Sequence, residues 1–301
     1  MKILRISTRS YSYRDFAHLF DGPVCVTLTK KSLHNLKQSN KRLLSKINTG
    51  ETIYGVNTGF GNLSKIKIDP KDQKDLQLNL VRSHASGVGN PLELGLMRTI
   101  FVLKLLTYVK GYSGIRPAVA EKIVQFLNHD ILPVIPEKGS VGASGDLAPL
   151  GHMALALIGE GKVFYNGKEI TTKTALSKAN IKPLVLQQKE GLSLINGTQV
   201  STALAIKSLL DGDLLLKTAD IAGALSVENS FASRKVFQKK IHALKNHPGQ
   251  QSAASNVYKL LNGSKIVKSH SNCGIVQDPY SFRCIPHIHG ASKDGFTRAA
   301  N

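Results

Sequence analysis

The pattern of apolar and polar positions predicts a mainly helical protein, because apolar residues recur every three or four positions over most of the chain. On this spacing, helices are expected at Ser32–Ile47, Asp75–Ser83, Leu92–Val109, Pro117–Asn128 and Leu147–Ile158. The longest pattern, Thr198–Glu228, would be roughly 45 Å long if unbroken, and Asp211-Gly212-Asp213 is a candidate kink within it. Two shorter helices are expected at Val236–Lys245 and Ala253–Leu261. Long helices usually pack in bundles, so this part should be all-helical.

A few short strands are expected in the first part of the chain. Val24–Leu28 alternates as a strand does, and Leu132–Pro136 should be extended. Lys162–Ile170 is expected to form a hairpin around Asn166-Gly167, a strong two-residue turn signal. The fold class predicted is mainly α, with a mixed N-terminal region followed by the start of a long-helix bundle. We expect domains at residues 1–195 and 196–301.

Composition places the chain among globular proteins. It has 301 residues, of which 42% are hydrophobic, enough for a substantial core. No run of about eighteen apolar residues is present, and Met1–Arg5 leads into polar sequence without an apolar signal core, so we expect a cytoplasmic protein that does not bind membranes. Cys25, Cys273 and Cys284 are far apart without a Cys-x-x-Cys pair, which favours free thiols over disulfides or a zinc site.

The chain is strongly basic, with 40 Lys and Arg against 20 Asp and Glu, a net charge of +20 and a pI near 9.9. Such a balance alone would indicate nucleic acid or an anionic surface as a partner. The basic residues are scattered, however, and no aromatic residues are interleaved with them as in nucleic-acid modules. We therefore expect no nucleic-acid partner. Another explanation is that acidic residues belong to a part of the polypeptide that is absent here.

The stretch Gly139–Leu150 carries the most specific chemistry in the sequence. At its centre is Ala143-Ser144-Gly145, and a glycine amide can approach a neighbouring carbonyl where a side chain would block it. Attack of the Gly145 nitrogen on the Ala143 carbonyl, with loss of two waters, would give the electrophile 4-methylidene-imidazole-5-one (MIO). A serine between small residues is more often only a turn. No Gly-Lys-Ser/Thr of a P-loop and no Gly-x-Ser-x-Gly elbow is present.

The whole run Gly139–His152 resembles the signature of the aromatic amino-acid ammonia-lyases, whose prosthetic group is MIO. This resemblance implies that MIO forms from Ala143, Ser144 and Gly145 and that the enzyme needs no metal. Glu190–Gln199 resembles the second signature of the family. This second resemblance implies that Asn196 lies against the ring carbonyl and polarises it. The alternative for a buried asparagine is a structural role.

Two residues nearer the N-terminus acquire expected roles through the same resemblance. Tyr54, in the glycine-rich segment Tyr54–Gly61, corresponds to the general base on the family's mobile loop; otherwise it would be a packed tyrosine beside a glycine turn. His84 corresponds to the position that faces the substrate ring, and a histidine there is similar to the histidine-specific lyases. A lone histidine is more often structural.

The last matching stretch is Gln277–Cys284. The resemblance implies that Arg283 binds the substrate carboxylate with its planar fork, and that Tyr280, as a catalytic residue, and Gln277, as a binding residue, line the same pocket. The similarity covers Tyr54–Asp294. It fails at Gly295–Asn301, which does not look like the helix that continues in the family.

The function implied is elimination of ammonia from L-histidine to give urocanate, by a homotetramer. Phenylalanine or tyrosine ammonia-lyase activity is the alternative substrate choice. Family chains run much further and take active-site residues from their C-terminal half, so this chain alone is expected to be inactive, and an inactive truncated remnant remains a rival reading. A second rival interpretation is a basic interaction protein that has kept the sequence of an enzyme.

Overall fold

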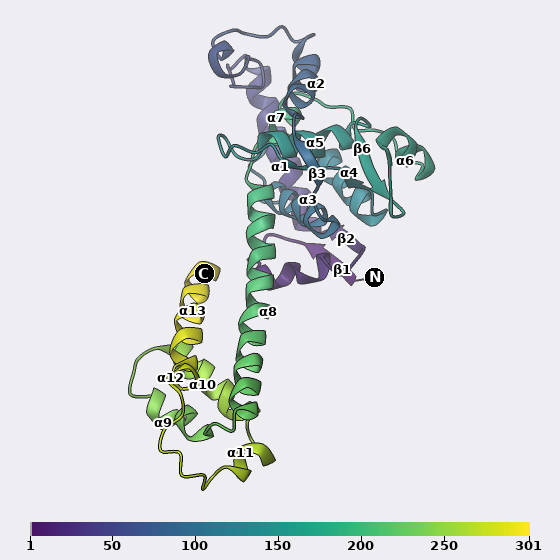
Figure 1. Cartoon of the computed structure of the whole chain (residues 1–301). Helices are drawn as coiled ribbons and strands as arrows, with labels where there is room; N and C mark the ends of the chain where they lie inside the picture. Colours follow the sequence, from purple (N-terminus) through teal and green to yellow (C-terminus); the bar gives the residue numbers. More distant parts are fainter. Residues whose placement is uncertain (1) are drawn as a thin grey trace. The chain divides into compact units, whose positions relative to one another are not determined.

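The chain folds into two compact units. A computed structural model describes residues 2–301, and its contacts divide the chain into a first unit ending at Ile206 and a second unit, Lys207–Asn301. Both units are mainly helical (Figure 1), as the hydrophobic pattern predicts. The expected domain boundary at residue 195 stays a prediction.

The first unit combines seven helices and seven short strands among its described residues. The helices are α1 (Lys30–Asn48), α2 (Gln73–His84), α3 (Leu94–Tyr108), α4 (Pro117–Asn128), α5 (Leu147–Leu157), α6 (Thr172–Lys178) and α7 (Glu190–Ile195). The strands are β1 (Lys2–Ile6), β2 (Val24–Leu28), β3 (Val88–Pro91), β4 (Leu132–Pro133), β5 (Pro136–Lys138), β6 (Lys162–Tyr165) and β7 (Lys168–Thr171). Short 3-10 helices are found at Tyr13–Leu19 and Gly61–Leu63.

The strands form three small sheets. β1 and β2 pair in parallel, β3 and β5 pair antiparallel, and β4, β6 and β7 form an antiparallel sheet with β6 in the centre. The predicted hairpin is confirmed: Asn166 (φ 51°) and Gly167 (φ 73°) are both left-handed, as a type I′ turn requires. The predicted strand at Val24–Leu28 is also confirmed.

Helix α3 is the centre of the first core. It is apolar on almost every face and buried on almost every face, as its sequence predicts. Its Phe101 packs edge-on against Phe126 of α4 with ring centroids 6.0 Å apart. Its one buried arginine, Arg98, is neutralised by Asp130 at 2.8 Å and also donates to the carbonyl of Leu19.

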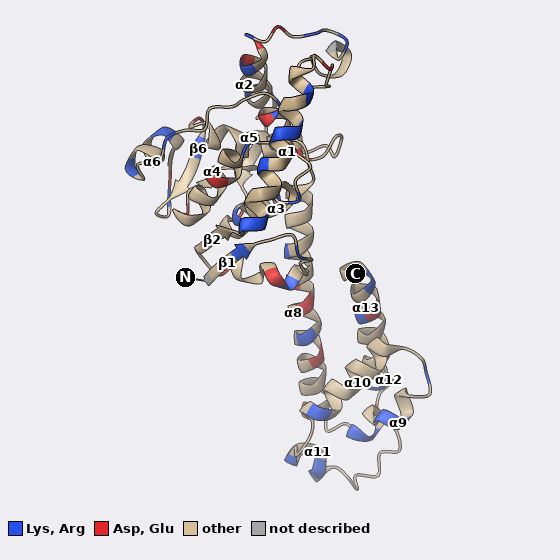
Figure 2. Ribbon diagram, turned by 180° about the vertical axis from the view of Figure 1, so that it is seen from behind, with Lys and Arg blue, Asp and Glu red and all other residues tan. Residues whose placement is uncertain are grey.

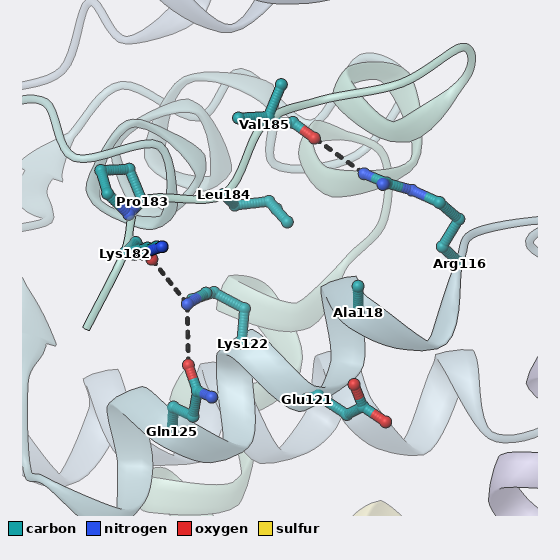
Figure 3. Close-up of a pocket in the computed structure, with 9 residues that line it drawn as sticks. All are labelled: Arg116, Ala118, Glu121, Lys122, Gln125, Lys182, Pro183, Leu184 and Val185. Carbon is teal, nitrogen blue, oxygen red and sulfur yellow. Dashed lines mark hydrogen bonds between the residues drawn. The ribbon is translucent and has the colours of Figure 1, made fainter.

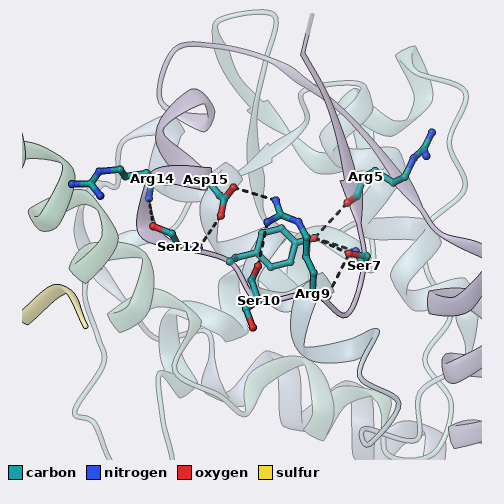
Figure 4. Close-up of polar contacts among 8 residues, drawn as sticks. Arg5, Ser7, Arg9, Ser10, Ser12, Arg14 and Asp15 are labelled. Atoms are coloured by element: carbon teal, nitrogen blue, oxygen red, sulfur yellow. Dashed lines mark hydrogen bonds and ion pairs between the residues drawn. The ribbon is translucent and has the colours of Figure 1, made fainter.

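The loop between β1 and the first 3-10 helix is held by polar contacts (Figure 4). Ser12 and Asp15 form a capping box, in which the Ser12 amide donates to the Asp15 carboxylate. Arg9 pairs with the same carboxylate at 3.1 Å. The Ser12 hydrogen bond, and then Arg9, lower the pKa of Asp15 below its ordinary value.

The second unit is built around the C-terminal part of the long helix α8 (Gln199–Asn229), which begins in the first unit. Its other elements are a 3-10 helix at Arg234–Phe237, α9 (Lys239–His242), α10 (Pro248–Leu260), α11 (Lys265–Ser269), α12 (Tyr280–Arg283) and α13 (Ile285–Ala300). Its small core consists of Ala224, Val227, Ala232, Phe237, Val257, Leu261 and Ile285.

Two sequence expectations about this unit concern its long helices. Gly295–Asn301 was expected not to resemble the helix that continues in the family, yet α13 extends to Ala300. Asp211-Gly212-Asp213 was a candidate kink, and α8 is helical through it over 31 residues. The two helices meet here, because a Cβ at Gly212 would lie 2.8 Å from the ring of Phe296; the glycine makes room for the phenylalanine of α13.

The two short helices also differ from their predicted bounds. The expected helix at Val236–Lys245 is instead a 3-10 turn followed by the four-residue α9. The expected helix at Ala253–Leu261 begins earlier, at Pro248, because the fixed φ of proline suits the first turn of a helix.

Three helices of the second unit meet at one buried carboxylate. Asp220 of α8 is 2% exposed and accepts hydrogen bonds from Asn256 of α10 at 2.7 Å, from His289 of α13 at 3.1 Å and from Lys293 of α13 at 2.5 Å. Removing the carboxylate would leave the ammonium of Lys293, which is 15% exposed, without its partner. Asp220 therefore fixes α10 and α13 against α8.

We predict that Asp220→Ala lowers the free energy of unfolding by about 3–5 kcal/mol, as expected when one member of a buried ion pair is removed. Asp211→Ala, on the same helix, removes an exposed i,i+4 pair with Lys207 and should cost less than about 0.5 kcal/mol. Urea unfolding followed by circular dichroism measures both. Equal losses in the two variants would contradict a special role for Asp220.

Candidate active site

The loop that carries Ala143-Ser144-Gly145 has an unusual backbone. Gly142 (φ 71°), Ser144 (φ 60°) and Gly145 (φ 88°) are all left-handed, and a non-glycine residue such as Ser144 adopts that region only rarely. Ala143 and Ser144 are exposed, whereas Gly145 is half-buried and leads into the buried Asp146. The loop therefore turns through Ser144 in a backbone conformation that favours glycine.

Gly145 is pressed against the backbone of a second signature motif. It forms a parallel bridge with Gly197, and the amide of the next residue, Asp146, donates to the Gly197 carbonyl at 2.8 Å. A Cβ at Gly145 would collide with that carbonyl oxygen. Glycine is thus required at position 145 by its positive φ and by the close approach of the Gly197 backbone.

Asp146 organises the residues around this contact. It is 1% exposed and precedes the first residue of α5. Its carboxylate accepts from Ser140 Oγ at 2.9 Å, from the Ser201 amide at 2.8 Å and from Ser201 Oγ at 2.6 Å. One carboxylate therefore joins the start of the ring-forming loop to the first turn of α8.

Asn196 is the C-terminal cap of α7, and its side-chain Nδ2 donates to the Leu192 carbonyl at 3.1 Å. An amide nitrogen has two N–H groups, so one of them remains for another acceptor. The Asn196 carbonyl is held by Lys104 of α3, whose Nζ lies 2.6 Å away. Asn196 thus has both its side chain and its carbonyl oriented by neighbouring elements.

Lys104 is fully buried, and among the described residues it forms no ion pair. Its Nζ also lies 3.5 Å from the Gln199 side-chain oxygen and 5.5 Å from the centre of the Tyr108 ring. Burial lowers the pKa of Lys104 to about 7, although the negative charge of Asp146 acts in the opposite direction. The sequence shows only one lysine in an apolar helix, so we did not predict its position beside Asn196.

Helix α7 is fixed by an ion pair between a buried glutamate and a half-buried arginine. Glu190, at its first residue and 1% exposed, accepts two hydrogen bonds of 2.7 Å from the guanidinium of Arg116. The segment that leads into α7 is held on α4 by Arg116, which donates to the Val185 carbonyl, and by Lys122, which donates to the Lys182 carbonyl (Figure 3). These contacts hold the start of α7, the helix that Asn196 caps.

The segment of Tyr54 is attached to the same helix through one glutamine. Gln77 of α2 is fully buried; it donates to the Gly55 carbonyl at 3.1 Å and accepts from the Leu192 amide of α7 at 3.0 Å. Tyr54 itself is 55% exposed, packs edge-on against Phe60 and accepts from the Gly61 amide at 3.1 Å. Gln77 was also not predicted, because a single glutamine in a helix carries no recognisable pattern.

His84 is the last residue of α2 and is half-buried. Its Nδ1 lies 2.8 Å from the Leu80 carbonyl, and because a carbonyl can only accept, Nδ1 carries a proton. In the neutral ring Nε2 is then an acceptor. The segment after His84 is held by the signature histidine His152, whose Nε2 accepts from the Gly87 amide at 3.0 Å.

Gln277, Tyr280 and Arg283 belong to the second unit. Gln277 and Tyr280 are exposed, and Arg283 is half-buried with its guanidinium 5.4 Å from the Tyr280 ring centre. Arg283 Nε donates to the Asp278 carbonyl at 2.9 Å, while the Asp278 carboxylate accepts from the Ser233 amide at 2.7 Å. Nε is used within the protein, and the two terminal nitrogens of Arg283 have no partner among the residues described.

Gly145 therefore contacts the Asn196–Gly197 segment directly. The segment that carries Tyr54 is connected to α7, which ends at Asn196, through Gln77. A cavity of about 570 Å³ lies between the N-terminal loop, α3 and the start of α8, and a groove of about 280 Å³ lies beside α4. None of the expected site residues lines either of them. Within residues 2–301, no group of three or more His, Cys, Asp or Glu could hold a metal ion, and no helix is long and apolar enough to cross a bilayer.

Comparison with known proteins identifies the family. A family model for aromatic amino acid lyases matches residues 11–301. The chain belongs to the aromatic amino acid lyase family. This confirms the family inferred from the signature motifs and its mainly helical fold.

Among its relatives, a histidine ammonia-lyase of Myxococcus xanthus is 47% identical over 259 residues, which cover 86% of this chain and 51% of that protein. A histidine ammonia-lyase of Alkaliphilus oremlandii is 42% identical over 301 residues, or 100% of this chain and 59% of that protein. The crystal structure of histidine ammonia-lyase from Trypanosoma cruzi has a TM-score of 0.87 at 31% identity and covers 100% of this chain and 55% of that chain. The lyase-family chain thus spans about half the length of the curated relatives it matches.

We predict a characteristic pH dependence of stability from Lys104. The unfolded chain keeps the Lys104 proton up to its ordinary pKa of 10.5, whereas the folded chain releases it near 7. Between these values the folded state binds fewer protons, so the free energy of unfolding contributed by this group rises with pH, by at most about 1.4 kcal/mol per pH unit. Below pH 7 the contribution is constant.

Urea unfolding of wild type and Lys104→Met at several pH values measures this contribution, because other titrating groups cancel in the difference. The stability of wild type relative to the variant should increase from pH 7 to pH 10. A difference that stays constant or falls with pH would show that the pKa of Lys104 is not lowered.

Proposed function

We propose that this chain contains the ring-forming part of a histidine ammonia-lyase, which eliminates ammonia from L-histidine to give urocanate. The observation that carries the proposal is the contact of Gly145 with Gly197, with Ser144 and Gly145 both left-handed, inside the family's signature. The names of the relatives support the choice of histidine. Residues 1–195 are proposed as the MIO-bearing domain and 196–301 as the first part of the bundle.

MIO would be formed by the chain itself from Ala143, Ser144 and Gly145. The Gly145 nitrogen bonds to the Ala143 carbonyl carbon, whose oxygen leaves as water. Ser144 then loses its hydroxyl and its α-proton as a second water, which creates the exocyclic methylidene. The residues present fit this product, because Gly145 lacks the side chain that would prevent the contact with Gly197, and Ser144 already has a positive φ.

MIO supplies an electrophile to which the amino group of the substrate adds, so that this group becomes a better leaving group. We propose that Tyr54 removes the β-proton, which is not acidic on its own. Arg283 would hold the carboxylate through its two terminal nitrogens, because its Nε is already used by the Asp278 carbonyl. We propose Tyr280 as a catalytic residue and Gln277 as a substrate-binding residue, and the remaining N–H of Asn196 would polarise the ring carbonyl.

His84 supports histidine over phenylalanine or tyrosine as the substrate. Its Nδ1 is committed to the Leu80 carbonyl, so the neutral side chain offers Nε2 as an acceptor for the N–H of an imidazole ring. An apolar ring has no such donor. Phenylalanine or tyrosine ammonia-lyase activity remains the alternative that the test below distinguishes.

The assembly and location are also proposals. The chain spans only 59% of the Alkaliphilus oremlandii relative, and we propose that the complete protein is a homotetramer of the family type. Lys and Arg lie on helices of both units rather than on one (Figure 2), which supports a small-molecule substrate over nucleic acid. The free thiols of Cys25, Cys273 and Cys284 support a reducing, cytoplasmic location.

We predict that Ser144→Ala prevents formation of the methylidene and lowers turnover of the active enzyme by roughly a thousandfold or more, as loss of an essential reactive group does. The wild-type peptide that contains residues 143–145 should be lighter by the mass of two waters, and the variant should not. Ser45→Ala, on the exposed face of α1, is the control and should retain both the mass change and activity. Normal turnover by Ser144→Ala would exclude MIO.

We predict that His84→Leu lowers kcat/KM for histidine by about 10- to 100-fold, the effect of one lost hydrogen bond. Turnover of phenylalanine or tyrosine should change much less. His129→Leu is a matched control, because His129 makes the same kind of contact from Nδ1 to a carbonyl one turn earlier, at 2.9 Å, on the exposed end of α4. Equal losses on all substrates would mean that His84 is structural.

A further inference from the structure

We propose that Lys104 is a positioning residue for ring formation: its side-chain amino group donates to the carbonyl of Asn196 and thereby holds the Gly197 backbone against Gly145. This inference rests on the proposed function, since it concerns the same ring. It assigns a role to a side chain on α3 that lies outside the signature motifs.

Lys104 lies in the interior of the first unit. Burial of an ammonium group is costly unless it is compensated by hydrogen bonds or an opposite charge. Lys104 is 0% exposed, and its compensation comes from the Asn196 carbonyl at 2.6 Å and from Gln199 Oε1 at 3.5 Å. The short contact is to backbone, so the lysine fixes the path of the chain and not only a side chain.

Backbone contacts connect Asn196 to the ring-forming loop. The carbonyl held by Lys104 belongs to the peptide that enters Gly197. The carbonyl of Gly197 in turn accepts the amide of Asp146, and Gly197 forms the bridge with Gly145. From Lys104 to Gly145, one unbroken series of backbone contacts is therefore present.

Lys104 and the ring-forming loop also interact electrostatically. Asp146, whose negative charge favours the protonated form of Lys104, lies at the other end of the same series. The Asn196-Gly197 segment thus lies between a buried lysine, whose amino group holds one of its carbonyls, and an aspartate, whose amide binds the next carbonyl. Loss of the lysine donor would free the first carbonyl, and Gly197 would then be held against Gly145 from one side only.

The consequence for ring formation is geometric. Gly145 has a positive φ, and the backbone of Gly197 occupies the space behind it. A mobile Gly197 would let Gly145 relax, so its nitrogen would meet the Ala143 carbonyl less often. A methionine at position 104 would fill nearly the same volume but could not donate a hydrogen bond. The Lys104→Met variant therefore tests the hydrogen bond to Asn196 without removing the packing of the side chain.

Amide hydrogen exchange at single-residue resolution tests this on the chain of 301 residues, whether or not the ring has formed. In Lys104→Met, the Asp146 amide should exchange at least tenfold faster than in wild type, while core amides of α3 and α4 change by less than twofold. Lys104→Arg keeps the charge and the donor and should restore protection at Asp146. Lys110→Met, an exposed lysine just after α3, is the control and should resemble wild type.

Unchanged exchange at Asp146 in Lys104→Met would overturn the proposal, and so would equal acceleration throughout the first unit, which indicates a role in stability alone. If arginine accelerates exchange in α3 itself, Lys104→Gln, a neutral donor, takes its place and should protect Asp146 better than methionine does. Equal exchange in the glutamine and methionine variants would count against the proposal.

The mass of the peptide with residues 143–145 is measured on the same samples. If the wild-type chain has lost two waters, Lys104→Met should contain a smaller dehydrated fraction, and an equal fraction would contradict the proposal. If the wild-type chain has not lost them, that result counts against the proposed function, whereas the exchange at Asp146 still decides the role of Lys104.

Discussion

The contact between the backbones of Gly145 and Gly197 is the constraint on which the first unit depends. Two segments from different signature motifs approach so closely that neither a side chain at Gly145 nor a different path at Gly197 could be accommodated. The surrounding elements hold this approach: α5 begins at it, α7 ends at it, and α8 starts just after it. The ion pair between half-buried Arg116 and buried Glu190 holds the start of α7 in place.

The polar residues near this contact are buried and well satisfied. Asp146, Glu190 and Gln77 are each 1% exposed or less, and each bonds to two separate segments of the chain. Removal of any one would leave buried donors or acceptors unpaired, which is more costly than loss of the bond itself. The site is thus held by groups that do not take part in the proposed chemistry, which is how a loop with strained backbone angles is kept in place.

Much of the fold could be predicted from the sequence, because helical spacing is strong in segments such as Leu92–Val109 and turn chemistry is strong at Asn166-Gly167. The prediction failed where tertiary contacts decide the outcome. The helical end of α13 depends on Phe296 fitting against Gly212, a pairing of residues far apart in the chain. The motifs identified Ser144 and Asn196 as candidates, but Lys104 and Gln77 are single polar residues in helices, and only their neighbours in space distinguish them.

Helix α8 begins in one compact unit and ends in the other, and its hydrogen bonds run through the boundary without a break. Helical hydrogen bonding is cooperative, so the loss of structure in either unit extends into residues that the other unit needs. The two units have separate cores, yet neither can unfold with its own segment of α8 and leave the rest of the helix unaffected. Their unfolding transitions are therefore coupled, and a denaturation curve for the chain reports a shared stability and not the sum of two independent ones.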